Sequence, residues 1–417
     1  MRVLLVSVET ERLSMTVLPL GLGMVGAVTR RAGHDVELLN VRATDIPAEA
    51  VGRAVTEFRP DVVGFSVRNV DDQHMLNPRL LLPPVAEAVA ACRVHTDAPV
   101  VVGGAGYSIF PRPILSFLGA DLGVRGEGEV AFPELLRRLE TGEEVAGVPG
   151  VDVAGRPGGL PPAATPDLDL LPLPDETTWR SADPVDPELL LPVQSRRGCP
   201  LDCSYCSTAS IEGRPIRFRT AARVAAHLAQ LSEAGFRRFY FVDNVFNLPP
   251  LYSLSLCREI AALRLPIKWR CILYPYALAG ELADAMAEAG CTEASLGFES
   301  GSEPVLAAMN KRFRPGDVRA VSEALSQRGI RRNGFLLLGG PGETPETVEQ
   351  SLAFADSLGL ESLKITAGIR IYPGTPLAAE AVADGLIAPG DDLLQPRFFL
   401  DPRVRDAIPR LLAGRTG

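Results

Sequence analysis

Three of the seven cysteines in this 417-residue chain lie within a single stretch of eight residues. Cys199, Cys203 and Cys206 are spaced Cys-x3-Cys-x2-Cys in the segment RRGCPLDCSYCS. Cysteine thiolates ligate iron–sulfur clusters, and three of them on one loop can hold three irons of a 4Fe–4S cluster. The fourth iron then has no protein ligand and is open to a small molecule. The spacing therefore predicts a cluster that is also a reaction site.

Two other uses of grouped cysteines fit the sequence less well. A structural zinc site takes four Cys or His ligands, and the nearest histidine, His227, falls inside a predicted helix. A disulfide framework is typical of secreted chains, whereas the first residues, MRVLLVSVETER, turn polar too soon for a secretory signal. We expect a cytoplasmic protein in which Cys257, Cys271 and Cys291 are buried apolar side chains.

The cysteine loop resembles the cluster-binding loop of the radical S-adenosylmethionine enzymes. Gly198 and Pro200 bend the backbone around the first cysteine, and Tyr205 precedes the last one. The resemblance implies that the open iron binds the amino and carboxylate groups of S-adenosylmethionine, which an electron from the cluster cleaves to methionine and a 5'-deoxyadenosyl radical. It also implies a small-molecule substrate and an external electron donor, a flavodoxin or ferredoxin. Tyr205, which can cover the cluster, is a candidate catalytic residue.

The segments around this loop alternate between strand and helix patterns. Residues 189–195 (LLLPVQS) are a predicted strand that ends at the cysteines, and six such strand–helix repeats extend to residue 376. This alternation predicts a parallel sheet curled into a partial (β/α)6 barrel, with active residues on the loops at the carboxyl ends of the strands. We therefore expect a barrel domain at 189–376.

The expected ligand contacts of this barrel all follow its predicted strands. The resemblance implies that they bind S-adenosylmethionine: Asp243 and Asn244 at the amino group, Glu299 and Ser300 at the ribose, Gly339 and Gly340 at the adenine or ribose, and Arg312, with Arg314, at the carboxylate. For the two arginines the alternative is a solvated loop. Tyr372, in IYPGTPL after the last strand, is a second candidate catalytic residue that walls the pocket, with a structural turn as the alternative.

Residues 1–139 show five further strand–helix units. The predicted strands are 2–8, 35–40, 61–66, 99–104 and 121–124, and the predicted helices are 20–31, 47–58, 80–92, 111–118 and 129–139. Such alternation predicts a flavodoxin-like or Rossmann-like parallel sheet with helices on both faces, whose ligand lies beyond the carboxyl ends of the strands.

This first domain resembles the cobalamin-binding domain that precedes the barrel in many radical S-adenosylmethionine enzymes. The implied cobalamin contacts lie on loops after the strands: residues 7–15, Ser66, Arg68, Asn69, Gly103, Gly104, Gly106, Tyr107 and Glu127. The Asp-x-His-x-x-Gly motif that supplies an axial histidine is absent, so we expect cobalt to have no histidine ligand from the protein. His74 is the histidine on a ligand-facing loop, where a solvated side chain is the alternative. The fold can also persist without the cofactor.

The remaining segments bound the domains and the partners. Residues 140–188 are rich in proline and lack periodicity, which indicates a packed linker. Residues 377–417 form a short extension, with FFL and RLLAG suggesting one strand or helix. A net charge of −9 argues against nucleic acid as a partner, and no apolar run approaches the ~20 residues that cross a membrane.

The sequence therefore predicts a radical enzyme with a 4Fe–4S cluster, S-adenosylmethionine and cobalamin. The first interpretation is C-methylation of a small natural-product intermediate through methylcobalamin. The alternative is a non-methylating dehydration, dehydrogenation or rearrangement of an aminosugar-like substrate, with the first domain empty. A third class, an electron carrier or zinc module, does not explain the glycine and carboxylate motifs at the strand ends.

Overall fold

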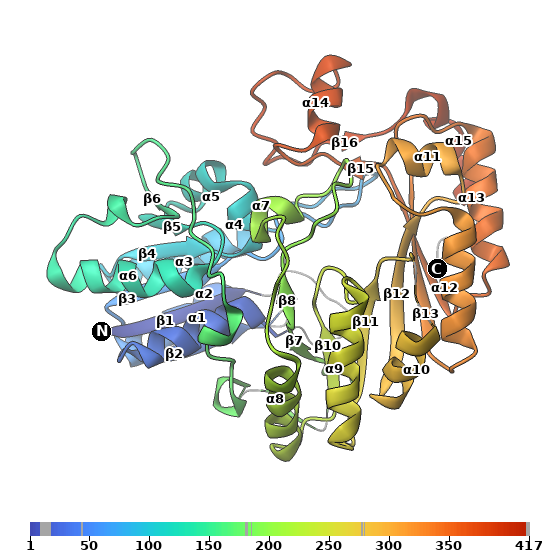
Figure 1. Cartoon of the computed structure of the whole chain (residues 1–417). Helices are drawn as coiled ribbons and strands as arrows, with labels where there is room; N and C mark the ends of the chain where they lie inside the picture. Colours follow the sequence, from blue (N-terminus) through green and yellow to red (C-terminus); the bar gives the residue numbers. More distant parts are fainter. Residues whose placement is uncertain are drawn as a thin grey trace.

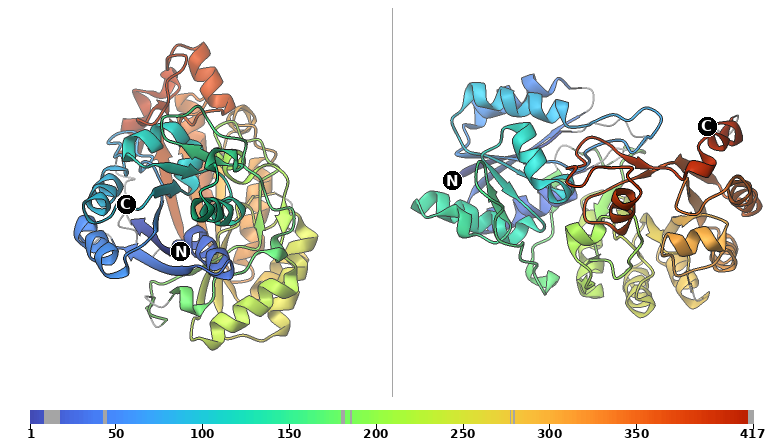
Figure 2. Two further views of the ribbon diagram at one scale, coloured as in Figure 1. Left: turned by 90° about the vertical axis from the view of Figure 1, so that its left-hand side faces the viewer. Right: turned by 90° about the horizontal axis from the view of Figure 1, so that it is seen from above.

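The computed structural model describes residues 1–8, 18–42, 45–179, 182–184, 186–276, 278 and 280–413. Two six-stranded sheets organise this part of the chain, and the domains built on them lie side by side (Figures 1 and 2). This arrangement is the α/β fold that the alternating pattern predicts.

The first sheet has the strand order β2-β1-β3-β4-β5-β6. Its first five strands are parallel and β6 is antiparallel to β5. The strands are β1 (Arg2–Val8), β2 (Asp35–Val41), β3 (Val62–Ser66), β4 (Val100–Gly103), β5 (Leu122–Val124) and β6 (Val151–Val153). The helices are α1 (Leu20–Arg31), α2 (Pro47–Phe58), α3 (Pro83–His95), α4 (Ala105–Ile109), α5 (Pro111–Leu118) and α6 (Gly128–Thr141).

Successive residues of β1 enter two different cores, which explains its unbroken apolar sequence. Leu4 and Val6 pack with α2, α3 and α5 on one face of the sheet. Val3 and Leu5 pack with α1 and α6 on the other face. The carboxyl edge of the sheet is thereby left for the loops that carry the candidate ligand contacts.

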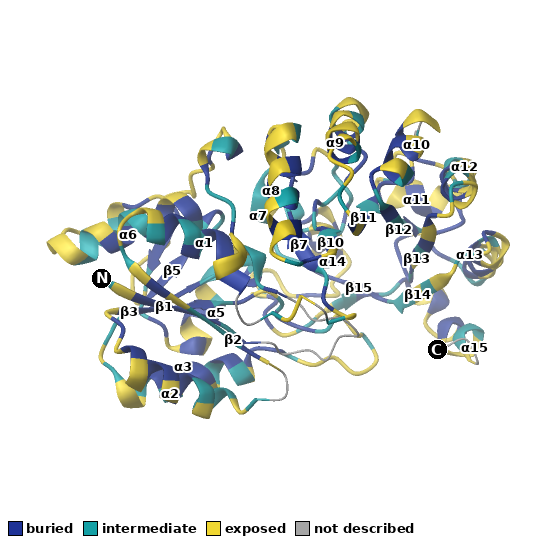
Figure 3. Cartoon of the chain, turned by 90° about the horizontal axis from the view of Figure 1, so that it is seen from below, coloured by how far each residue is buried: buried dark blue, intermediate teal, exposed yellow. Residues whose placement is uncertain are grey.

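The second sheet is parallel throughout, in the order β14-β13-β12-β11-β10-β7. Its strands are β7 (Leu191–Val193), β10 (Arg238–Phe241), β11 (Lys268–Leu273), β12 (Cys291–Glu299), β13 (Arg331–Leu338) and β14 (Ser362–Ala367). The covering helices are α8 (Ala221–Glu233), α9 (Pro250–Ala262), α10 (Gly280–Glu288), α11 (Glu303–Ala308), α12 (Pro315–Ser326) and α13 (Pro345–Ser357). Their exposed faces point outward and their buried faces toward the strands (Figure 3).

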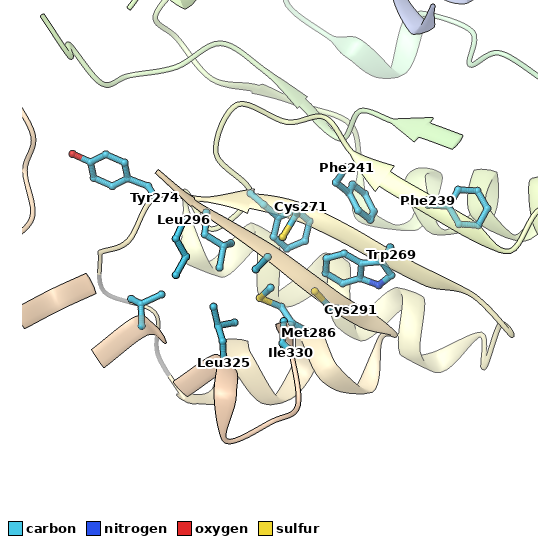
Figure 4. Close-up of a cluster of buried hydrophobic side chains, with 14 of the residues drawn as sticks. Phe239, Phe241, Trp269, Cys271, Tyr274, Met286, Cys291, Leu296, Leu325 and Ile330 are labelled. Atoms are coloured by element: carbon cyan, nitrogen blue, oxygen red, sulfur yellow. The ribbon is translucent and has the colours of Figure 1, made fainter. Parts of the chain in front are cut away.

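Aromatic and sulfur-containing side chains fill the core between this sheet and its helices (Figure 4). Trp269 packs edge-on against Phe241, with ring centroids 5.1 Å apart. Cys257, Cys271 and Cys291 are all buried and free, as predicted.

Short elements connect and close the two domains. They are β8 (Arg196–Arg197), β9 (Arg217–Phe218), α7 (Thr208–Glu212), β15 (Ile369–Arg370), β16 (Phe398–Phe399), α14 (Pro376–Ala383), α15 (Ala407–Leu412) and the 3-10 turns η1 (Val145–Gly147), η2 (Leu168–Leu170), η3 (Glu176–Trp179) and η4 (Pro402–Val404). The extension after residue 376 thus holds helices and a strand, where a single element was expected. In the part of the chain that the structure describes, no helix is long and apolar enough to cross a membrane.

Two elements differ from the sequence-based prediction in the first domain. β6 lies inside the segment expected to be a linker, because three residues between glycine and proline turns give no periodic signal. α4 occupies 105–109, where an open glycine loop was expected. The rest of the linker packs down as expected: Arg219 donates hydrogen bonds to the carbonyls of Leu168 and Leu171.

Candidate active site

The cysteine loop connects β8 to β9 and is held at both ends. Gly198, with φ +91°, begins the loop, and a Cβ atom there would lie 2.2 Å from the Pro215 carbonyl oxygen. The position therefore requires glycine. In the middle of the loop, the Ser204 amide donates to the Met309 carbonyl, and the Ser204 carbonyl accepts from Leu377. The loop is thereby fixed against both α11 and α14.

The three loop cysteines are free thiols with graded exposure. Cys199 is buried, Cys203 is partly buried and Cys206 is exposed. Burial raises the pKa of Cys199 and of Cys203; charge on the neighbouring loop thiols raises both further, whereas the Lys311 ammonium lowers that of Cys203. Within the described residues, no three Cys, His, Asp or Glu side chains converge as ligands of one metal ion. A four-iron cluster differs in that each thiolate binds its own iron.

A buried charged cluster lies beside Cys203. The Glu299 carboxylate, at the end of β12, accepts hydrogen bonds from the Tyr205 hydroxyl at 2.9 Å and from the Lys311 ammonium at 3.2 Å. The Lys311 ammonium also donates to the Tyr205 oxygen at 2.9 Å and lies 5.1 Å from the centroid of that ring. Burial and the charges of Glu299 and Cys203 raise the pKa of Tyr205, so the phenol stays protonated at neutral pH. The structure thus brings two of the predicted residues, Tyr205 and Glu299, to the cluster loop.

Lys311 is a site residue that we did not predict from the sequence. We predicted the neighbouring Arg312 instead. The Arg312 side chain is 57% exposed, and its guanidinium pairs with the Asp202 carboxylate at 2.8 Å. Only 5% of the Lys311 side chain is exposed, and it points toward the loop. The sequence offered one indication of this role: only three of the 42 basic residues are lysines, and Lys311 is one of them. Lys311 is therefore a further candidate for the carboxylate contact, and the contact expected of Arg312 stays a prediction.

Asp243 and Asn244 also have other partners than the expected amino group. Asp243 is fully buried and accepts hydrogen bonds from the backbone amides of Ser195 and Arg196 at 2.8 and 3.2 Å. Its carboxylate also pairs with the Arg196 guanidinium at 3.3 Å. Asn244 donates to the Glu212 carboxylate at 2.6 Å. Asp243 therefore holds the strand that leads into the cysteine loop, and Asn244 holds α7, the helix that follows the last cysteine.

The glycines after β13 form a turn whose backbone amides already have hydrogen-bond partners within the protein. The amides of Gly339 and Gly340 donate to the Glu343 carboxylate. A Cβ atom at either glycine would lie 2.4 Å from a side-chain carbon, of Leu400 and of Met309 respectively. The close approach that these glycines permit in this structure is to neighbouring side chains, and a contact with adenine or ribose stays a prediction.

Two further candidate residues complete this edge of the barrel. Ser300 is buried, and its hydroxyl shares a hydrogen bond of 2.9 Å with that of Ser351; its expected ribose contact stays a prediction. Tyr372 packs against Phe110 of the first domain with ring centroids 6.1 Å apart. Burial raises the pKa of Tyr372, and the charges of Asp71 and Cys206 raise it further. Tyr372 therefore lies between the two domains and within electrostatic reach of the cysteine loop.

Glu343 gives a prediction about stability and pH. Burial raises its pKa to about 7 from 4.5, so the folded protein keeps a proton that the unfolded chain has lost between those values. The free energy of unfolding should therefore fall as pH rises through this range, by on the order of 3 kcal/mol. Glu343→Gln cannot ionise and should gain stability relative to the wild type from about pH 5 to about pH 8. Thermal unfolding midpoints measure this, and parallel curves for the two proteins would refute it.

A cavity of about 430 Å³ lies at the carboxyl edge of the first sheet. Its inner wall is apolar and includes Leu5, Phe65 and Phe132. Five of the predicted cobalamin contacts line it: Ser66, Arg68, Gly103, Gly104 and Glu127. The cavity is bounded on its other side by barrel-domain residues, namely Gln194, Arg197, Ile211, Glu212 and Val242.

The other expected cobalamin contacts lie elsewhere. Tyr107 is buried in α4 and donates a hydrogen bond of 2.9 Å to Asp152 of β6. A Cβ atom at Gly106 would meet the side chains of Val67 and Val70 at 3.0 Å, so packing within the domain explains this glycine. Asn69 is partly exposed and His74 is exposed, neither lining the cavity. Residues 9–15 of the first expected loop lie outside the described residues.

Buried ion pairs join the two domains beside this cavity. Arg197 pairs with Glu129, and Arg217 with Glu127. Burial alone would raise the pKa of Glu127, but the Arg217 hydrogen bond and the two arginine charges hold it below its usual range. A further buried ion pair, between Asp71 and Arg370, joins the loop after β3 to β15.

Comparison with known proteins identifies both domains of this chain. Residues 8–136 match the sequence model described as B12 binding domain, and residues 193–355 match that of the Radical SAM superfamily. The fold matches the radical S-adenosylmethionine methyltransferase TsrM from Kitasatospora setae, a structure with cobalamin and a 4Fe–4S cluster bound. The TM-score is 0.80 at 26% identity, over 92% of this chain and 75% of that one. This chain therefore combines a B12-binding domain with a radical S-adenosylmethionine domain.

Several curated relatives of this chain carry methyltransferase names, and two others are named as anaerobic magnesium-protoporphyrin IX monomethyl ester cyclases. An uncharacterised methyltransferase of Pyrococcus horikoshii is 28% identical over 405 residues, covering 93% of this chain and 84% of that protein. The tryptophan 2-C-methyltransferase of Streptomyces laurentii is 26% identical over 387 residues, 77% of this chain and 64% of that protein. The family matches fall within the expected domains 1–139 and 189–376, whose limits stay predictions.

The two domain families imply a 4Fe–4S cluster, S-adenosylmethionine and cobalamin, and residues of this chain fit all three. Three free thiols on one fixed loop suit the cluster. The Glu299 carboxylate and Lys311 ammonium beside them suit the hydroxyl and carboxylate groups of S-adenosylmethionine. The cavity at the carboxyl edge of the first sheet, which five of the predicted contacts line, suits cobalamin. Its volume suits one part of a molecule as large as cobalamin, such as the nucleotide tail.

Proposed function

We propose that this protein is a C-methyltransferase that acts on a small molecule held between its two domains. One observation carries the proposal. The cavity at the carboxyl edge of the first sheet is bounded by residues that flank the cysteine loop, Gln194 and Arg197 before it and Glu212 after it. The cobalamin and cluster sites therefore share a wall, as transfer of a methyl group to a radical made nearby requires.

Each group has its own set of residues in this proposal. Cys199, Cys203 and Cys206 hold the cluster, and the cavity holds the nucleotide tail of cobalamin. When bound, the cluster supplies an electron for cleavage of S-adenosylmethionine, and cobalamin supplies a methyl carrier. Lys311 and Glu299 bind and orient S-adenosylmethionine through charge-assisted hydrogen bonds. Tyr205 keeps its proton and fixes Glu299, and Tyr372, packed against Phe110, shields the contact between the two domains from water.

Lys311 should determine the affinity for S-adenosylmethionine. Lys311→Met removes the buried charge but keeps most of the apolar length of the side chain. A hydrogen bond to a charged group contributes about 1.5–3 kcal/mol, so we expect the affinity to fall by about 10- to 100-fold. Equilibrium dialysis of the reconstituted protein without reductant measures it, and iron content verifies the cluster.

The matched control is Arg312→Met, one residue along the chain. Its guanidinium is exposed and pairs with Asp202, so the affinity should stay at the wild-type value. Equal losses in both variants, or a loss confined to Arg312→Met, would refute the assignment of Lys311.

Methylation itself is tested with S-adenosylmethionine deuterated on its methyl group. Because a relative is named for methylation of tryptophan, tryptophan is the first substrate to assay, followed by other small aromatic compounds. We expect the label in the product and S-adenosylhomocysteine among the by-products. A substrate that is dehydrated, oxidised or rearranged without gaining label would instead support the non-methylating alternative.

A further inference from the structure

The cysteine loop and the cavity have one polar wall in common. Gln194 and Arg197 precede the first cysteine, Glu212 follows the last one, and all three line the cavity. Glu212 belongs to α7, the short helix that leaves the loop. A ligand that fills the cavity therefore touches side chains on both arms of the cluster loop.

These side chains form a continuous chain of hydrogen bonds. Arg197 pairs with Glu129 of the first domain and donates to the side-chain amide oxygen of Gln194 at 2.8 Å. Gln194 donates to the Glu212 carboxylate at 3.0 Å. The other Glu212 oxygen accepts from the Gly198 amide at 3.0 Å. Gly198 is the residue before Cys199, so this series of hydrogen bonds extends from the first domain to the start of the cluster loop.

We infer that Glu212 is a positioning residue that couples the two cofactor sites, so that cobalamin and the cluster each strengthen binding of the other. Cobalamin in the cavity restricts Gln194 and Glu212, which fixes the backbone at Gly198 and orders the loop for iron. The cluster orders the same side chains from the opposite end. Because both ligands order one network, the second to bind finds part of the ordering already done. The effect is reciprocal by thermodynamic linkage.

The inference rests on the proposed function, and a binding experiment that requires no turnover tests it. Hydroxocobalamin is titrated into the full-length protein with and without the reconstituted cluster, and the two dissociation constants are compared by visible absorbance. We expect binding to be about 5- to 150-fold tighter in the cluster-loaded protein, the usual range for coupled sites. A wild-type ratio of one overturns the inference.

Glu212→Gln assigns the coupling to this residue. All three partners of the carboxylate donate to it, so an amide nitrogen there must face at least one donor. We expect the ratio of the two dissociation constants to fall toward one. Asp202→Asn is the matched control, because it neutralises an exposed carboxylate within the loop that does not line the cavity. Its ratio should remain that of the wild type.

Gln194→Ala interrupts the same chain at another point and keeps the test decisive if Glu212→Gln does not fold, as judged by circular dichroism. A wild-type ratio in the folded variants overturns the role of Glu212. If the wild type binds both groups independently, the coupling is refuted while the proposed function stands. If the wild type binds no hydroxocobalamin, both are refuted.

Discussion

Replacing Cys199, Cys203 and Cys206 together by alanine should leave the protein without its cluster and abolish formation of 5'-deoxyadenosine. The three thiols are the cluster ligands that this loop offers, and thiolates are required to hold the irons. Iron content after anaerobic reconstitution and 5'-deoxyadenosine released with dithionite are the two measurements. Both should fall to background.

Cys92→Ala is the matched control, because Cys92 is a free buried cysteine of α3, outside the loop. It should keep the wild-type iron content and 5'-deoxyadenosine yield. A triple variant that still releases 5'-deoxyadenosine would contradict the assignment of the cluster.

Arg370→Ala should destabilise the protein more than the removal of any surface charge. Arg370 of β15 donates to Asp71 of the first domain at 2.8 Å, with 2% and 1% of the two side chains exposed. It also donates to the carbonyl oxygens of Ile371 and Leu393 at 2.6 and 2.7 Å. Removing one partner of a buried pair leaves the other charge uncompensated, at a cost of about 3–5 kcal/mol. Urea titration measures the free energy of unfolding.

Arg258→Ala is the comparison for this effect. Its pair with Glu281 is exposed, at 63% and 65% of the two side chains, and such pairs contribute about 0–1 kcal/mol. Equal losses in the two variants would show that the contact between Asp71 and Arg370 does not hold the domains together. Arg370 also lies 5.2 Å from the centroid of the Tyr372 ring. Removal of the Arg370 side chain should therefore also disturb the position of Tyr372.

Most of the fold could be predicted because short patterns in the sequence determine its helices and strands. The helices over 47–58 and 111–118 begin with proline and end at apolar residues, and their bounds agree with the structure. Parallel strands buried on both faces leave uninterrupted apolar runs such as RVLLVSV. The cysteine loop was recognisable because its spacing directly reflects the chemistry that it supports.

The rest of the site depends on contacts between distant residues. Asp243 follows a strand, as a ligand contact would, but its partners Ser195 and Arg196 lie 48 and 47 residues away in the sequence. Which of Lys311 and Arg312 faces the loop is decided by the packing of Tyr205 and Tyr274 around the lysine. Glycines can serve close packing within the protein as well as a ligand, and the sequence does not distinguish these uses at Gly339 or Gly106.

The central claim is that one chain uses its cluster loop and its cobalamin cavity on the same chemistry. The most direct test is to quantify 5'-deoxyadenosine and S-adenosylhomocysteine in one anaerobic reaction of the reconstituted protein with dithionite, S-adenosylmethionine, hydroxocobalamin and a methyl-accepting substrate. We predict that both products form and that the triple cysteine variant makes no 5'-deoxyadenosine. A wild-type protein that binds both cofactors yet forms neither product would contradict the claim.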